Sequence, residues 1–144
     1  MAVLLLAILF LGVIAGYFLR KIAIEEMKEL DSYLRYSLIV LLSSSIAVFA
    51  FSFGLVFFIT SFILSLALLM IFKDKRYVLH AFLVLCGFLF FFAKDAVAFS
   101  AILVMYFIVQ SSLERDISKS SMKLIYFLVP ALISYAAIFL GGVV

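Results

Sequence analysis

Charged residues are scarce in this 144-residue chain. Asp, Glu, Lys and Arg make up 13% of the residues, against about 25% in soluble domains, while hydrophobic residues make up 69%. Residues 36–72 contain neither a charge nor a proline. No polar segment between the apolar runs is long enough to fold as a separate catalytic module. These absences exclude a soluble domain held by one anchor, and they predict that the whole chain is a membrane protein.

Cysteine and histidine are nearly absent as well. Cys86 is the single cysteine, which excludes a disulfide framework and a Cys-x-x-Cys redox or metal pair. His80 is the single histidine, and a metal site needs three or four ligands, with no partners at ligand spacing here. We therefore expect Cys86 to be a small buried hydrophobe and His80 to be neutral at the membrane interface. We expect no metal and no cofactor.

Signatures of catalysis and of ion coupling are missing too. The sequence contains no Gly-x-Ser-x-Gly, and we expect no catalytic residues and no enzyme. No charged residue lies inside an apolar run away from its ends, which argues against a carboxylate-coupled antiporter built from this chain alone. The basic residues are divided among short polar segments, so we expect lipid headgroups rather than nucleic acid as partners.

The uncharged stretch at residues 36–72 predicts a transmembrane hairpin. As one helix it would extend about 55 Å, whereas a bilayer needs about 20 helical residues. The chain must therefore cross, turn and cross back. We place the turn at residues 51–54, because Gly54 tolerates the positive φ that a tight reversal needs.

The apolar runs predict an all-α, polytopic bundle of six transmembrane helices in a single domain of residues 1–144. The predicted spans are residues 2–19, 33–51, 55–72, 77–93, 96–111 and 124–140. Residues 20–32 are expected to form an amphipathic linker lying flat at the membrane surface, with Asp31 or Ser32 as the N-cap of the second span.

The distribution of Lys and Arg predicts the orientation of this bundle. Ten of the eleven basic residues fall in the first, third and fifth loops, and Lys94 alone falls on the other side. Because Lys and Arg of short loops stay in the cytoplasm, both termini are predicted to lie outside, in a multi-pass protein of the cell membrane.

Small residues recur at helical spacing and predict close helix packing. Gly12 and Gly16 form a Gly-x-x-x-Gly pair in the first span. Two further seams consist of Ser43, Ala47, Ala50 and Gly54, and of Pro130, Ser134, Ala137 and Gly141. Pro130 removes the amide that would bond to Tyr126, so we expect a kink, with the freed carbonyl satisfied by Ser134 or a neighbouring helix.

Polar side chains inside the spans are the candidates for a substrate path. Three consecutive helical serines fan over about 200°, so Ser43 can join a packing seam while Ser44 and Ser45 face another helix or a polar path. The candidate path residues are Ser44, Ser45, Ser61, Ser65, Tyr106, Ser134 and Tyr135.

The front of the chain resembles the lysine-exporter family of multi-pass membrane proteins. The resemblance covers residues 11–20 (LGVIAGYFLR) and 30–42 (LDSYLRYSLIVLL), which give a glycine-containing first span, a charged linker and a Leu-Asp entry into the second span. The resemblance implies amino-acid export, by half of a transporter that pairs with another chain. The resemblance assigns no substrate-binding residue in this sequence.

Our reading of the sequence is a small-solute transporter resembling the amino-acid exporters, or half of one, acting as a homo-oligomer or in a larger membrane complex. One alternative is a non-catalytic subunit packed against a larger membrane partner. It is favoured by the six glycines and one proline, which leave little sequence for broken helices. A second alternative is an enzyme acting on lipid.

Overall fold

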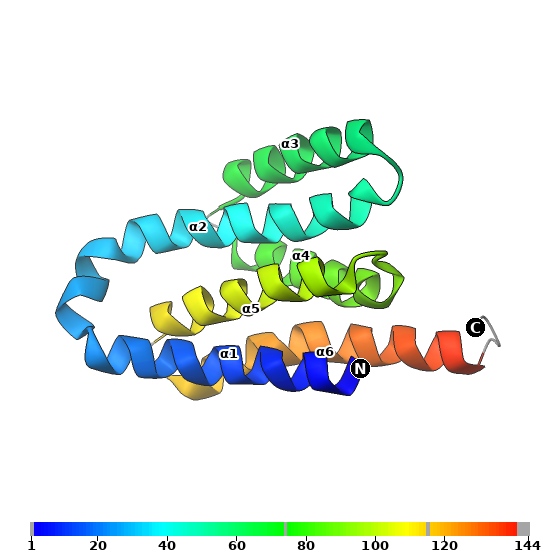
Figure 1. Ribbon diagram of the computed structural model, residues 1–144. Coiled ribbons are helices and arrows are strands. Elements are labelled where there is room, and N and C mark those ends of the chain that lie inside the picture. The colour runs from blue at the N-terminus through cyan, green and yellow to red at the C-terminus, as the bar shows by residue number, and fades with distance from the viewer. Residues whose placement is uncertain (1, 74, 115, 141–144) are drawn as a thin grey trace.

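The computed structural model describes residues 2–73, 75–114 and 116–140, and its regular structure is entirely helical (Figure 1). The elements are α1 (Ala2–Ile22), α2 (Ile24–Phe51), α3 (Leu55–Ile71), α4 (Arg76–Leu89), the 3₁₀ turn η1 (Phe90–Phe92), α5 (Ala96–Leu113) and α6 (Ile117–Leu140). The predicted all-α helix bundle is confirmed.

Three of these helices contain segments that are long and apolar enough to cross a membrane. The segments are Glu29–Phe51, Ala96–Leu113 and Ser121–Leu140 among the described residues. The helical stretches Leu55–Ile71 and Tyr77–Phe92 are apolar but shorter. The chain therefore has the helices of a membrane protein, and the count of six spans and their orientation stay predictions.

The turn between α2 and α3 lies where the sequence places it. The amides of Ser52, Phe53 and Gly54 donate to carbonyls three residues earlier, and Gly54 has φ 123°. A side chain at Gly54 would meet no atom within 4 Å, so the residue serves the turn and does not serve the helix packing that the small-residue seam predicted.

Residues 20–32 are helical apart from Ala23, but they do not form an element of their own. α1 continues to Ile22 and α2 begins at Ile24, so the segment is divided between these two helices. Its place at the membrane surface stays a prediction. Asp31 and Ser32 lie inside α2 and cap nothing. Instead the Asp31 carboxylate accepts from Arg35 Nε at 2.9 Å, an i,i+4 pair that supports continuing the helix.

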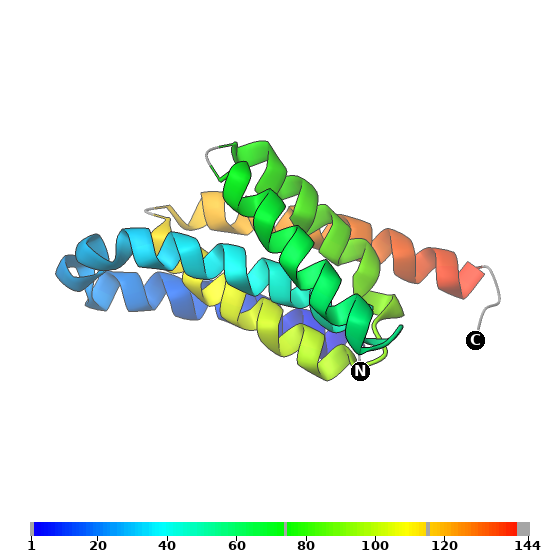
Figure 2. The ribbon, with the colours of Figure 1, turned by 90° about the horizontal axis from the view of Figure 1, so that it is seen from above.

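The helices form two groups: α1, α2, α3 and α5 pack together, and α4 and α6 form a second pair. α5 lies between α1 and α2, α3 packs on α2, and α4 pairs with α6 (Figures 1 and 2). In an inverted repeat α1, α2 and α3 would correspond to α4, α5 and α6, so the packing of α4 on α6 would require α1 to pack on α3. α1 packs on α5 instead. The structure therefore shows no inverted repeat in its helix pairing.

Successive helices run in opposite directions. The α1–α2, α3–α4 and α5–α6 connections lie towards one end of the bundle (Figure 1). The α2–α3 and α4–α5 connections, the start of α1 and the end of α6 lie towards the other end. The described basic residues that the sequence assigns to the first, third and fifth loops consequently share one end, which we call the basic end.

Glycine allows the closest helix contacts. A Cβ on Gly12 would lie 3.2 Å from the carbonyl oxygen of Val104, and one on Gly16 would overlap the Ile108 carbonyl oxygen, so this face of α1 packs directly on α5. Gly87 packs in the same way on α6, where a Cβ would overlap the carbonyl oxygen of Phe127. Gly87 is less conspicuous in the sequence than Gly12 and Gly16, because no second small residue accompanies it at i±4.

Aromatic rings join the α4–α6 pair to α5. Phe90 stands edge-on to Phe99 of α5 and to Phe127 of α6, with ring centroids 6.0 and 5.5 Å apart. Phe107 of α5 meets Phe127 at 6.1 Å. All four rings are buried, and such edge-to-face pairs contribute about 0.5–1.5 kcal/mol each beyond their burial.

The other seam residues differ in burial. Ser43, Ala47 and Pro130 are buried and Ala50 is half-buried. Ala137 is exposed, so it does not pack against another described helix, and Gly141 lies outside the described residues. Pro130 lies within the continuous helix α6, and the Ser134 hydroxyl donates to Pro130 O at 3.0 Å rather than to the carbonyl of Tyr126.

Candidate functional site: a cationic pocket at the basic end

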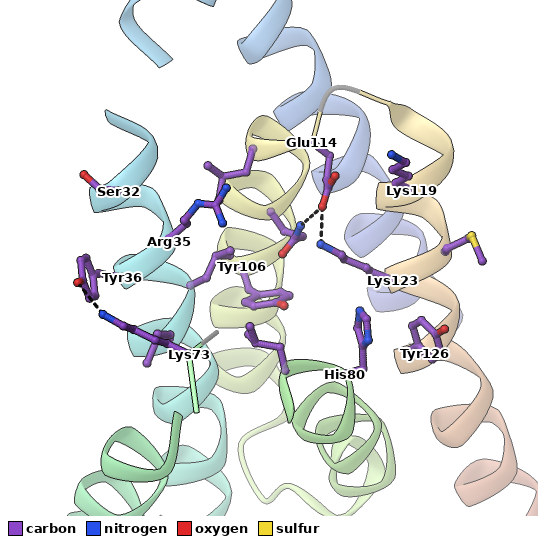
Figure 3. Close-up of a pocket in the computed structure, with 16 residues that line it drawn as sticks. Ser32, Arg35, Tyr36, Lys73, His80, Tyr106, Glu114, Lys119, Lys123 and Tyr126 are labelled. Atoms are coloured by element: carbon purple, nitrogen blue, oxygen red, sulfur yellow. Dashed lines mark hydrogen bonds and ion pairs between the residues drawn. The ribbon is translucent and has the colours of Figure 1, made fainter. Parts of the chain in front are cut away.

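A pocket of about 600 Å³ opens among α2, α4, α5 and α6 at the basic end (Figure 3). It is lined by Ser32, Arg35, Tyr36, Leu38, Ile39, Lys73, Leu79, His80, Tyr106, Gln110, Leu113, Glu114, Lys119, Met122, Lys123 and Tyr126. Its volume lies in the range of small-molecule sites.

α5 provides the floor of this pocket. Tyr106, Gln110 and Glu114 recur every four residues, so they share one face of the helix. Tyr106 and Gln110 are buried, and the Gln110 amide donates to Glu114 Oε1 at 3.3 Å. This polar stripe is the signal that sequence reasoning missed: it identified Tyr106 but not the two residues that continue its face.

An ion pair closes the side of the pocket formed by α6. Lys123 Nζ lies 2.5 Å from Glu114 Oε1, and the two side chains are 23% and 25% exposed. The same carboxylate oxygen thus accepts from both Lys123 and Gln110 (Figure 3). Partial burial strengthens such a pair relative to an ion pair in open solvent.

α2 and the α3–α4 connection form the opposite side. Lys73 Nζ lies 3.5 Å from the Tyr36 hydroxyl and 5.6 Å from the centroid of the Tyr36 ring, a cation–π distance. Arg35 directly precedes Tyr36 on α2 and also lines the pocket. Its ion pair with Asp31 is exposed to solvent, so it holds the guanidinium only weakly.

His80 of α4 and Tyr126 of α6 meet at the base. Their rings are stacked, with centroids 4.8 Å apart and planes inclined by 25°. His80 therefore lies at the pocket rather than at an isolated interface position. Within the described ranges, no group of three His, Cys, Asp or Glu side chains comes close enough to hold a metal ion.

The charges around the pocket are unequal. Four basic side chains line it, Arg35, Lys73, Lys119 and Lys123, against the single carboxylate of Glu114. Leaving His80 aside, the lining has a formal excess of three positive charges, which the Asp31 carboxylate bound to Arg35 reduces to two. α4 also begins here, and the positive end of its helix dipole adds to the same potential.

A second carboxylate lies beside the mouth of the pocket. Asp116 is fully exposed and accepts from the Ser118 amide at 3.0 Å. The Ser118 backbone and side-chain hydrogen bonds, with the charge of Lys119, hold the pKa of Asp116 below its ordinary value. Asp116 does not line the pocket, so its charge offsets that of Lys119 only at the rim.

The predicted path serines do not enter the pocket. The hydroxyls of four donate to carbonyls of their own helix: Ser44 to Val40 O, Ser45 to Leu41 O, Ser61 to Phe58 O and Ser65 to Ser61 O. Ser134 is bonded to its helix in the same way, and Tyr135 lies at the surface beside Phe91 and Phe139. Of the seven candidates, Tyr106 alone lines the pocket.

The opposite end of the bundle has a second, more apolar hollow of about 610 Å³. It is lined by Val48, Phe51, Ser52, Leu55, Phe58, Lys94, Asp95 and Ala98. The two hollows have no lining residue in common, so they are separate in this structure. The pocket at the basic end is therefore one-sided in this structure.

Comparisons with known proteins give no match: no family model, no curated protein and no solved structure is similar to the chain. The resemblance of its first two helices to the lysine exporters stays a prediction. The fold and the site together define an all-helical bundle of the membrane class, with a cationic pocket at one end.

Proposed function

We propose that this chain is a six-span protein of the cell membrane, with both termini outside, that takes up a small solute at its cytoplasmic face as a transporter or half of one. The observation that carries the proposal is the pocket of about 600 Å³ at the basic end of an apolar bundle. Most membrane-helix surface binds only lipid, whereas this pocket gathers side chains that can orient a polar solute.

The direction of capture follows from the charge distribution. Of the ten basic residues that the structure describes, all but Lys94 lie towards the end where the pocket opens. Because positively charged loops remain in the cytoplasm, the mouth of the pocket faces the cytoplasm. A solute bound there would leave the cell, as the resemblance to the lysine exporters also implies.

A half-transporter fits the one-sided pocket better than a complete transporter. Crossing the membrane requires a polar path, and the serines expected to form one are bonded to their own helices. α3 presents a broad apolar surface, with Val56, Ile63 and Ile71 each at least 60% exposed. A second copy or a different chain docked on such a surface would complete the path, and lipid covers it otherwise.

The second candidate, a non-catalytic membrane subunit, has its own support. The described hydroxyls of α2 and α3 mostly donate within their own helices, and glycines bring α1 close onto α5 and α4 close onto α6. A subunit of this kind would bind its partner without moving a solute.

Solute efflux separates the two candidates. The chain is reconstituted, in the assembly in which it purifies, into phosphatidylcholine vesicles loaded with lysine, glutamate and inorganic phosphate. We expect at least one of these solutes to leave faster than from protein-free vesicles. The efflux should be lost in Lys123→Gln and kept in Lys21→Gln, a matched change at an exposed site outside the pocket. If correctly inserted protein releases none of the three, the subunit is the better account.

A further inference from the structure

The charge of the pocket favours one chemical class of solute. Four basic side chains face one carboxylate, and that carboxylate is already engaged by Lys123 and Gln110. A free lysine carries a net positive charge and would meet an excess of like charge, which stays positive when the Asp31 carboxylate bound to Arg35 is counted. A phosphate group carries about −1.5 to −2 charges at neutral pH and has oxygens that accept from Lys and Arg.

Two of the cations are placed to hold such a group from opposite sides. Arg35 on α2 and Lys123 on α6 both point towards the centre of the pocket, above the polar face of α5 (Figure 3). Arg35 can give two parallel hydrogen bonds to one phosphate, and Lys123 gives a point charge. Lys73 and Lys119 add charge on either side, nearer the rim.

The floor offers a donor between them. Tyr106 is 1% exposed and lines the pocket. Its hydroxyl is not one of the buried polar atoms without a partner among the described residues. The phenol can therefore donate a hydrogen bond to a ligand oxygen at the floor of the pocket.

We propose that the pocket binds a phosphate-bearing molecule, and that Lys123 leaves Glu114 to pair with its phosphate, opposite Arg35 and above Tyr106. The inference rests on the proposed function in taking this pocket as the solute site. Glu114 then has a defined role: it holds Lys123 in the empty pocket and competes with the ligand for it.

The phosphate can belong to a free solute or to a lipid headgroup. The pocket opens at the end of the bundle where cytoplasmic headgroups would lie, and basic pockets between membrane helices are known to bind anionic headgroups. The chemistry is the same in both cases, so the experiment must distinguish the sources.

Inorganic phosphate is the probe, with the full chain in nanodiscs of phosphatidylcholine, which has no net charge. We expect saturable binding by calorimetry, and no binding of lysine at the same concentrations. Lys123→Gln should weaken phosphate binding about tenfold or more, because one charge-assisted hydrogen bond is lost. Glu114→Gln should strengthen binding several-fold, because it frees Lys123. Lys21→Gln should leave binding unchanged.

Two further variants distinguish a loss of phosphate binding from misfolding. Lys123→Arg keeps the charge and should bind phosphate within a few-fold of the wild type. Tyr106→Phe removes only the floor hydroxyl and should weaken binding several-fold while keeping the thermal stability. A merely structural Lys123–Glu114 pair would give the opposite pattern, in which Glu114→Gln and Lys123→Gln lower the stability alike and neither changes binding selectively.

Replacing part of the phosphatidylcholine with phosphatidic acid distinguishes the two sources. If the lipid is the ligand, inorganic phosphate binds only in pure phosphatidylcholine, and phosphatidic acid displaces it in the wild type but not in Lys123→Gln. If the ligand is a free solute, phosphatidic acid has little effect. The inference is overturned if neither probe binds, or if lysine binds as well as phosphate. Phosphate binding without any efflux would overturn the transporter proposal and leave this site intact.

Discussion

Arg20, near the end of α1, donates from Nη1 to the carbonyl oxygen of Ser112 in the last turn of α5, at 2.9 Å. The same nitrogen also reaches the carbonyl of Leu113. These carbonyls belong to the last four of the helix, which have no partners within it. Arg20 therefore caps α5 and fixes the position of Glu114, the next residue along the chain.

Removing this cap should loosen α5 at the pocket. We expect Arg20→Gln to lower the free energy of unfolding by about 1.5–3 kcal/mol, the value of hydrogen bonds to a charged group. Thermal unfolding in detergent measures the change. Lys21→Gln is the control, because Lys21 is exposed beside Arg20 and should change stability by no more than about 0.5 kcal/mol. Equal effects of the two variants would show that Arg20 acts only through its charge.

The two glycines of α1 should differ in their tolerance of a side chain. A Cβ at Gly16 overlaps the backbone carbonyl of Ile108, which cannot move aside without shifting α5, whereas one at Gly12 stops 3.2 Å from the Val104 carbonyl. Gly16→Ala should cost about 1–3 kcal/mol, and Gly12→Ala clearly less. Thermal unfolding of both variants checks the order. If Gly12→Ala is the more damaging, α1 does not pack on α5 as described.

Ser43 and Ser45 should respond in opposite directions to alanine. Ser43 Oγ is buried without a hydrogen-bond partner among the described residues, while Ser45 donates to Leu41 O at 3.1 Å. Ser43→Ala removes an unsatisfied polar atom, so it should leave stability unchanged or raise it by about 1 kcal/mol. Ser45→Ala should lower stability by about 0.5–1.5 kcal/mol. A clear loss with Ser43→Ala would show that its hydroxyl binds something, such as a water or a partner chain.

Much of the fold was predictable because it follows from local patterns. The uncharged stretch around Gly54 is too long for one span, so it predicts a reversal. The charged residues Lys73 and Lys94 predict helix ends that lie within a few residues of the observed ones. The N-cap prediction at Asp31 or Ser32 was wrong, because the Asp31–Arg35 pair and the surrounding helix-forming residues continue α2 through the polar segment. Helix propensity outweighed the capping preference of Asp31 there.

The pocket was predictable only in part. Tyr106 stood out as a polar residue inside a span, and its spacing to Gln110 and Glu114 was visible in the sequence. The pairing of Glu114 with Lys123 was not, because it depends on how α6 folds back on the end of α5. The basic residues indicated orientation, and their convergence on one cavity required the positions of α2, α4 and α6.

Side-specific labelling tests most directly whether this pocket opens to the cytoplasm of a membrane-spanning bundle. Cysteines are placed singly at Met122, which lines the pocket and is 58% exposed, and at Lys94, which is exposed at the opposite end, in a Cys86→Ser background. A membrane-impermeant maleimide should label Lys94→Cys in intact cells and Met122→Cys only in inside-out vesicles. Labelling of Met122→Cys in intact cells, or of both positions from one side, would contradict the six-span account and its cytoplasmic pocket.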